Sequence, residues 1–298
     1  MPELPDVEIY VEALRDRVVG AKLQRILIRG PFLMRSIAPP VESLYGKKVR
    51  EVRRLGKQII FGFEGDLWLA LHLMIAGRLQ WRDSAAKPSP KTLATFEFDS
   101  GVLTLTEAGT QHRASLRLAT GEEGLQALNA GGIEVLEADL DTFAAVLTSA
   151  NHTLKRALTD PRSFSGIGNA YSDEILHRAG LSPVAMTQRL APESIAKLYN
   201  AMRNVLQDWV ERLRAEAAGQ FPKKVTAFRE EMAAHGKYGE PCPRCGSKIQ
   251  RIRYASNETN YCPQCQTGGK LLADRALSRL LRADWPRTLD ELEALKKR

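Results

Sequence analysis

Cys242-Pro-Arg-Cys245, followed after sixteen residues by Cys262-Pro-Gln-Cys265, restricts the fold of this 298-residue chain more than any other stretch. These four residues are its only cysteines. Two Cys-x-x-Cys pairs at this separation suit a tetrahedral Cys₄ zinc site, in which each pair forms a tight knuckle. Because four thiolates leave no open position for water or substrate, we expect one structural Zn²⁺ and no catalysis by that ion.

The surroundings of the cysteines are basic. Residues 221–298 contain 16 Lys and Arg against 9 Asp and Glu, so +7 of the formal net charge of +8 lies there. Arg251 and Arg253 lie between the two pairs, where they would either contact phosphates or solvate a small β-ribbon. The charge favours a polyanionic partner such as nucleic acid. Zinc ribbons also bind proteins, so this module alone names no function.

Outward from the module, the hydrophobic pattern changes near Gly121–Gly132. Before this point the chain alternates short segments rich in β-branched and aromatic residues with Gly, Pro and Asp, which predicts a β-sandwich flanked by a helix over Pro5–Val19. After it, helical periodicity dominates, and the segments that carry it are Leu140–Leu158, Ala170–Ala179 and Ser194–Ala217. We therefore predict an α+β protein with four parts: a β-sandwich domain (1–125), a helical domain (126–235), a zinc finger (236–266) and a helical C-terminal extension (267–298).

Two features argue against membrane insertion and secretion. The longest apolar stretch, Leu67–Gly77, is interrupted by His72 and is too short to span a bilayer. The N-terminus, Met-Pro-Glu-Leu-Pro-Asp-Val-Glu, has acids where a signal peptide needs basic residues. We expect a cytoplasmic protein without membrane contacts.

A glycine-rich turn precedes one predicted helix, in Ser165-Gly-Ile-Gly-Asn169. Gly166 and Gly168 allow backbone amides to approach a ligand, and the start of a helix favours an anion. Asn169 would cap that helix or donate its side-chain amide to a phosphate. A plain connection between two helices is the alternative interpretation.

The extreme N-terminus offers a nucleophile. Removal of Met1 would leave Pro2 with a free secondary amine, whose terminal position gives it an ordinary pKa near 8 and makes it nucleophilic near neutral pH. Glu3 is the adjacent acid/base candidate. Proline after methionine is common, so these two residues alone do not establish catalysis.

The three signals together resemble one family. Five blocks occur in the order seen in the formamidopyrimidine-DNA glycosylase/endonuclease VIII family, namely Pro2-Glu-Leu-Pro-Asp-Val-Glu8, Arg-Arg-Leu-Gly-Lys57, Leu71-His-Leu73, Ser165-Gly-Ile-Gly-Asn169 and the Cys₄ finger. The resemblance spans about residues 2–266. It implies a β-sandwich, a helical domain with a helix–two-turn–helix and a zinc finger, with DNA in the cleft between them.

The resemblance also implies roles for individual residues. Pro2 would form a Schiff base with C1′ of a flipped nucleotide, assisted by Glu3 as acid/base. Lys57, His72 and Asn169 match family residues that grip phosphates around that nucleotide. The implied partner is double-stranded DNA with damaged bases or abasic sites, bound by a monomer that would be nucleoid-associated if bacterial. The implied activity is base-excision repair, with base removal and cleavage at the abasic (AP) site.

Three departures concern the substrate. The family's His-Leu-Gly-Met-Ser-Gly reads His72-Leu-Met-Ile-Ala-Gly77 here, so Met74 replaces a glycine and Ile75 the gap-filling methionine. The family's Asp-Pro-Arg-Arg-Phe-Gly stretch is replaced by residues 106–116, in which Gln111, His112 or Arg113 would face the opposite base. Asn257 occupies the position of a phosphate-binding arginine in the finger.

Two alternatives therefore stay open: a lyase acting mainly on abasic sites, and a catalytically silent protein that binds damaged DNA.

Overall fold

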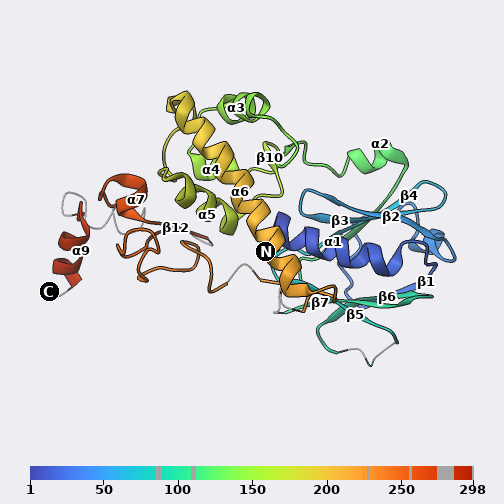
Figure 1. The fold of residues 1–298 in the computed structure, drawn as a ribbon. Coiled ribbons are helices and arrows are strands. Elements are labelled where there is room, and N and C mark those ends of the chain that lie inside the picture. The colour runs from blue at the N-terminus through green and yellow to red at the C-terminus, as the bar shows by residue number, and fades with distance from the viewer. Residues whose placement is uncertain are drawn as a thin grey trace. The chain divides into compact units, whose positions relative to one another are not determined.

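The chain folds into two compact units, which are described separately below. Unit 1 comprises Met1–Gly132 and Gln207–Ala227, and unit 2 comprises Ile133–Leu206 and Phe228–Arg298. The computed structural model (Figure 1) describes residues 1–84, 87, 89–108, 112–223, 225–226, 229–254, 257–273 and 285–296. The boundaries proposed at residues 125, 235 and 266 stay predictions.

Unit 1 is built on a β-sandwich, as predicted. One antiparallel sheet has the strand order β1-β6-β7-β5 and the other the order β2-β3-β4-β8. The strands are β1 (Leu23–Ile28), β2 (Val49–Leu55), β3 (Gln58–Phe63), β4 (Leu67–His72), β5 (Gly77–Arg82), β6 (Thr92–Phe98), β7 (Gly101–Glu107) and β8 (Ser115–Thr120). Short helices flank them at Val41–Leu44 and in α2 (Gly121–Gln126).

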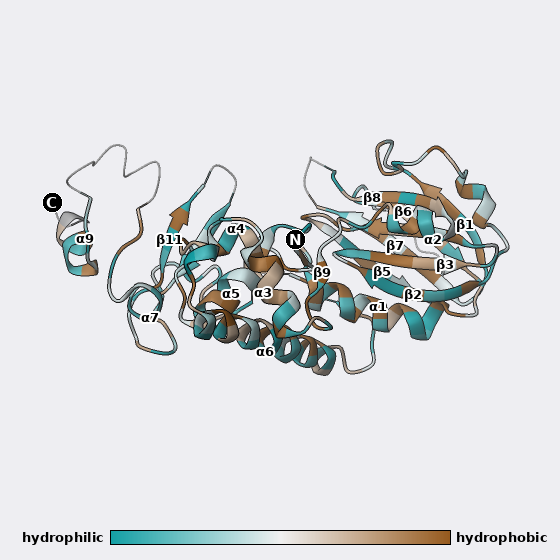
Figure 2. Cartoon of the chain, turned by 90° about the horizontal axis from the view of Figure 1, so that it is seen from above, coloured by the Kyte–Doolittle hydropathy of each residue, from teal (hydrophilic) through white to brown (hydrophobic). Residues whose placement is uncertain are grey.

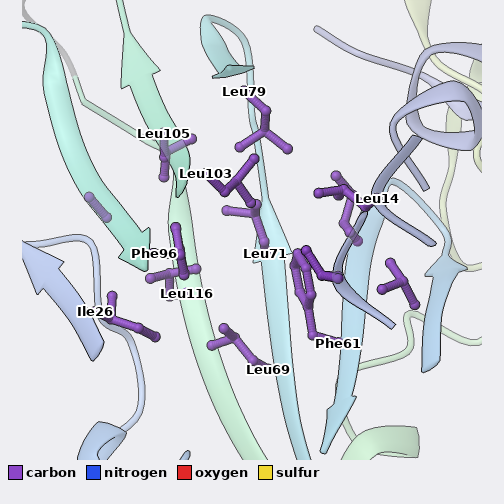
Figure 3. Packing of buried hydrophobic residues seen from close by; sticks show 14 of the residues in the cluster. Leu14, Ile26, Phe61, Leu69, Leu71, Leu79, Phe96, Leu103, Leu105 and Leu116 are labelled. Carbon is purple, nitrogen blue, oxygen red and sulfur yellow. The ribbon is translucent and has the colours of Figure 1, made fainter. Parts of the chain in front are cut away.

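The core of unit 1 lies between the two sheets. Figure 3 shows Phe61 and Leu71 of one sheet and Phe96 and Leu103 of the other in the same cluster, together with Leu14 of the first helix. All five side chains are at most 1% exposed. In the strands β6 and β7, buried and partly exposed residues alternate, which is the period-two pattern of a sheet with one buried face. Figure 2 shows hydrophobic residues running along these strands.

Helix α1 (Leu4–Val18) packs against β2. Proline occupies its first turn, and Glu3 and Asp6 form a capping box in which each side chain accepts a hydrogen bond from the other residue's backbone. The Nε of Arg15 donates to the carbonyl of Val52 on β2 at 2.7 Å. These contacts fix the position of the residues immediately before the helix, including Pro2.

Unit 2 is mostly helical. Its elements before the finger are β9 (Ile133–Glu134), α3 (Leu140–Thr148), α4 (Leu154–Thr159), β10 (Phe164–Ser165), α5 (Asn169–Ala179), a short helix at Thr187–Arg189 and α6 (Pro192–Ala217), whose last residues belong to unit 1. The helix α5 ends at Gly180 with φ of 68°, as the sequence predicted.

The prediction of one helix over Leu140–Leu158 was wrong. The segment forms two helices, α3 and α4, with residues 149–153 between them. The second helix begins after Thr153, whose backbone is extended, and the amide of Leu154 donates to the carbonyl of Ala185 at 2.8 Å. A long-range contact and residues that favour turns therefore outweigh the continuous helical pattern.

The finger consists of the hairpin β11 (Gln250–Arg253) and β12 (Glu258–Tyr261), followed by α7 (Pro263–Thr267). In the C-terminal extension the helix α9 (Leu289–Lys296) is described, whereas residues 274–284 lie outside the described part. Among the described residues, no helix is long and apolar enough to cross a membrane.

Candidate active site and zinc centre

The N-terminal residues that follow Met1 are buried. Pro2 is buried, and Glu3 is 1% exposed. Burial lowers the pKa of the amino group of Met1, which also lies within the electrostatic reach of Glu3, Arg78, Asp6 and Lys57. A lowered pKa increases the fraction of uncharged amine at neutral pH, which is the nucleophilic form.

Lys57 lies at the tip of the hairpin that joins β2 and β3. Leu55 pairs with Gln58, so Gly56 and Lys57 form a two-residue turn, and Gly56 adopts φ of 61°. Glycine at the first position of such a turn is the preference of a type II′ hairpin. Burial lowers the pKa of the Lys57 ammonium, and the charge of Glu3 opposes this shift. The turn thus places Lys57 within electrostatic reach of Glu3 and the N-terminal amine.

His72 is the last residue of β4 and pairs with Gln58, the neighbour of Lys57. Its Nδ1 accepts a hydrogen bond from the amide of Met74 at 2.9 Å. Burial, together with the charges of Lys57 and Arg117, lowers the pKa of His72 to about 4. The ring is therefore neutral at pH 7 and carries its proton on Nε2, where it is a hydrogen-bond donor.

The turn between β4 and β5 contains the two substitutions noted in the sequence. Met74 adopts φ of 51°, a left-handed conformation that glycine adopts without strain, and the side chain of Ile75 is 55% exposed. A Cβ atom at Gly77 would lie 2.3 Å from the carbonyl oxygen of Leu73, so only glycine fits there. The turn presents a bulky apolar side chain at its surface.

Arg78 was not identified from the sequence. Its Nη1 donates to the carbonyl of Gly77 at 2.7 Å and its charge acts on the N-terminal amine. The local signal was weak, because a single arginine after the turn has no distinctive spacing. Arg117, whose charge reaches His72, was missed for the same reason.

Arg113 belongs to the segment between β7 and β8. The amides of Arg113 and Ala114 donate to the buried carboxylate of Glu107 at 2.9 and 3.0 Å. Glu107 pairs with Gly77, so this segment starts beside the turn that carries Ile75. Glu107 was not predicted as an anchor, and Gln111 lies outside the described residues.

Asn169 lies in unit 2 and does not cap its helix, contrary to one of the two predictions. The N-cap of α5 is Gly168, and Asn169 is the first helical residue. Its Nδ2 donates to the carbonyl of Glu258 on β12 at 3.0 Å, so it joins the helix to the finger hairpin. The ammonium of Lys155 donates to the carbonyl of Asn169 at 2.6 Å.

Buried acids on α5 hold the chain that leads into the finger. The carboxylate of Asp173 lies 2.5 Å from Nζ of Lys155 and 2.8 Å from Nδ1 of His235. Its neighbour Glu174 accepts hydrogen bonds from the amides of residues 233, 234 and 235, each at 2.8 Å. Sequence patterns did not predict this network, because its members are far apart along the chain.

The four cysteines of the finger form a cluster that fits one zinc ion. Their Sγ atoms all lie within 4.8 Å of one another. The amides of Arg244 and Cys265 each lie 3.4 Å from a cysteine sulfur, as in the knuckles that stabilise thiolates. Four sulfurs around a tetrahedral ion with bonds of about 2.3 Å would be about 3.8 Å apart. Two pairs in the cluster lie at 3.9 Å and 3.4 Å. The predicted structural zinc site is confirmed.

The two arginines of the hairpin have different surroundings. The guanidinium of Arg251 lies 4.1 Å from the ring centroid of Tyr238 and 3.2 Å from the carboxylate of Glu258. Arg253 is exposed and pairs with Glu258 in the hairpin register, and the amide of its neighbour Tyr254 donates to the carbonyl of Asn257 at 2.8 Å. Arg251 therefore stabilises the finger, whatever else it contacts.

Comparison with known proteins gives three matches along the chain. The family model for the formamidopyrimidine-DNA glycosylase N-terminal domain matches residues 1–113, and the model for the H2TH domain of the same enzymes matches residues 132–218. The model for the zinc finger found in FPG and IleRS matches residues 239–268.

Similar sequences and structures cover most of the chain. The formamidopyrimidine-DNA glycosylase of Pelotomaculum thermopropionicum is 31% identical over 275 residues, which is 89% of this chain and 99% of that protein. The enzyme of Thermus thermophilus is 31% identical over 284 residues, which is 90% of this chain and 100% of that protein. Lactococcus lactis FPG in complex with DNA containing FAPY-dG has a TM-score of 0.79 at 28% identity, covering 89% of this chain and 100% of that one.

Proposed function

Because this chain belongs to the formamidopyrimidine-DNA glycosylase family, we propose that it is a base-excision-repair DNA glycosylase that also cleaves the strand at abasic sites. The observation that carries the proposal is that the buried N-terminal amine lies within electrostatic reach of Glu3 and Lys57, and that the charge of Lys57 reaches His72. A solved relative bound to DNA containing an abasic site supports the choice of substrate. We also propose that the protein is a monomer, that it is cytoplasmic and that it acts on double-stranded DNA.

The reaction begins with Pro2, once Met1 has been removed. The lone pair of its nitrogen attacks C1′ of the flipped nucleotide, and the damaged base leaves with the electron pair of the glycosidic bond. Glu3 accepts the N–H proton of the attacking nitrogen and passes a proton to the ring oxygen as the sugar opens, and the freed lone pair forms the iminium between Pro2 and C1′. The positive nitrogen acidifies the C2′ proton. Loss of that proton expels the 3′ phosphate, which breaks the strand.

The other residues near the N-terminal amine bind phosphate in this proposal. Lys57 supplies positive charge from the hairpin tip, and the neutral His72 donates from Nε2. Arg113 faces the base opposite the lesion, and Asn169, Arg251 and Arg253 contribute contacts to DNA from unit 2. The zinc ion supplies structural support to the finger through its four thiolate ligands, Cys242, Cys245, Cys262 and Cys265.

Borohydride trapping tests the mechanism. Wild-type protein should form a covalent adduct with a duplex that contains an abasic site, and with at least one duplex that contains 8-oxoguanine or an oxidised pyrimidine. Pro2→Gly retains only a primary amine without the ring, so we expect at least a hundredfold less adduct, and Glu3→Gln should lose base removal more than lyase activity. A protein that is active with Met1 retained, as measured by intact mass, would exclude Pro2 as nucleophile.

One observation favours a second candidate, a lyase that acts mainly on abasic sites. In this family the turn between β4 and β5 fills the gap that a flipped base leaves. Met74 and Ile75 give that turn side chains of a different shape, which would alter the recognition of an intact damaged base. Adducts on abasic DNA alone would support this candidate. Binding without any adduct would instead identify a silent damage-binding protein.

A further inference from the structure

The chain after the zinc finger contains a cavity that the proposed repair reaction does not use. The family model for the finger ends at residue 268, and residues 268–298 contain eight Lys and Arg against five Asp and Glu. The cavity has a volume of about 860 Å³ and is lined by residues 268–273, 285, 287 and 288, all of which belong to unit 2. Its size lies in the range of small-molecule sites.

The described part of the extension is attached to the finger. The amide of Leu271 donates to the carbonyl of Arg287 at 2.9 Å, which brings the two ends of the cavity lining together. The amide of Leu272 donates to the hydroxyl of Tyr261 on β12 at 2.7 Å. Lys248 of the finger forms an ion pair with Glu293 of α9, the C-terminal helix in Figure 1. The cavity is thus supported from both sides by ordered contacts.

The lining combines one aromatic side chain with two cations. Lys270 and Arg287 are exposed at the cavity, and Trp285 is partly buried in its wall. The indole Nε1 of Trp285 is buried and has no hydrogen-bond partner among the residues that the structure describes. Because this nitrogen is out of reach of solvent, a ligand in the cavity would contact the exposed part of the Trp285 side chain and not this donor.

This combination matches a nucleotide more closely than a simple anion. An aromatic surface stacks on a base, and cations on each side of it bind the adjoining phosphates. Bases within a duplex are stacked on one another, so a concave site with an indole in its wall accepts only an unpaired base. Duplex DNA would need no cavity, because its phosphates are reached by surface cations alone.

We propose that this cavity binds single-stranded DNA, with one unstacked base beside Trp285 and the flanking phosphates on Lys270 and Arg287. Base removal leaves one unpaired nucleotide opposite the abasic site, which gives such a site a ligand during repair. The inference goes beyond the proposed glycosylase activity and does not depend on Pro2.

The test uses the full-length, zinc-loaded protein and a labelled lesion-free oligothymidylate of about twelve nucleotides, a length within the range of known single-strand sites. Fluorescence anisotropy over a series of salt concentrations should show that Lys270→Gln/Arg287→Gln binds at least tenfold more weakly than wild type. Its salt slope should be smaller by about 1.4, at roughly 0.7 for each lost phosphate contact. RNA of the same length, bound more tightly than the DNA, would contradict the assigned ligand.

A matched control removes the same charge elsewhere in unit 2. Arg162→Gln/Lys197→Gln alters two exposed residues outside the cavity and should bind within about twofold of wild type. An equal loss of affinity for the oligothymidylate in the two double variants would mean that only the net charge of unit 2 matters. That result would overturn the proposal. Trp285→Leu should weaken binding by about fivefold or more through lost stacking. If this variant does not fold, the two exposed-residue variants still decide the question.

The two proposals fail in different experiments. Pro2→Gly should lose the borohydride adduct and still bind the oligothymidylate like wild type. An adduct in wild type together with oligothymidylate binding that is unaffected by Lys270→Gln/Arg287→Gln would remove the cavity proposal and leave the glycosylase proposal intact.

Discussion

The cations near the N-terminus of unit 1 and the cations Lys155 and Arg251 of unit 2 have different surroundings. In unit 1, burial lowers the pKa of the N-terminal amine, of Lys57 and of His72, which favours their uncharged forms. In unit 2, Lys155 lies 2.5 Å from Asp173, and Arg251 lies 3.2 Å from Glu258. In unit 1, loss of charge makes an amine nucleophilic and leaves the His72 ring with one N–H hydrogen-bond donor. In unit 2, the ion pairs hold segments of the backbone together.

Removal of zinc should have the largest effect and tests whether the two regions are independent. Structural zinc contributes about 10–16 kcal/mol in finger peptides, so chelation should unfold the finger and abolish DNA binding. Unit 1 has its own core and should stay folded. Circular dichroism, hydrogen exchange of residues 23–120 and DNA anisotropy on metal-free protein measure the three outcomes. Unchanged DNA affinity without zinc would contradict the role of the finger.

The substitution Asp173→Asn should have the next largest effect, because it removes the negative charge that faces the buried ammonium of Lys155. Breaking a buried ion pair from one side costs about 3–5 kcal/mol in the free energy of unfolding. The control, Asp160→Asn, breaks a pair with Arg162, whose side chain is 77% exposed, and should cost at most about 1 kcal/mol. Urea unfolding of both variants provides the comparison. Equal losses would mean that the network in unit 2 is no more important than a surface pair.

The pH dependence of stability should reveal His72. Its folded pKa is about 4 against an ordinary value of 6.5, so the unfolded chain binds more protons between these values. The free energy of unfolding should therefore fall as the pH falls from about 6.5 to about 4, by at most about 3 kcal/mol. His72→Gln lacks this contribution. Denaturation curves of wild type and variant that stay parallel across this pH range would show that His72 is not held neutral by the fold.

The smallest effect is expected at Met74. Glycine would relieve its left-handed conformation, so Met74→Gly should raise the free energy of unfolding by about 1 kcal/mol. Ile75→Gly, one residue later and without a positive φ, should give no such gain. Thermal unfolding of the two variants checks this. A loss of stability in Met74→Gly would mean that packing of the methionine side chain outweighs its backbone strain.

Local patterns in the sequence predicted the features that depend on neighbouring residues. The cysteine spacing predicted the metal cluster, and the helical pattern over Ala170–Ala179 predicted where α5 ends. The network of Lys155, Asp173 and His235 escaped prediction because its members are joined only by the fold. The break between α3 and α4 escaped it as well, because a contact with Ala185 decides where the second helix begins.

The burial of Pro2 has a consequence for the time at which the protein matures. Unit 1 includes residues 207–227, and Phe221 lies 5.6 Å from Tyr10 of α1, measured between ring centroids. At about 5–20 residues per second, more than two hundred residues must be synthesised before that contact forms. The N-terminus therefore leaves the ribosome long before unit 1 is complete. That interval of about ten seconds or more gives an aminopeptidase access to Met1 before unit 1 has folded completely.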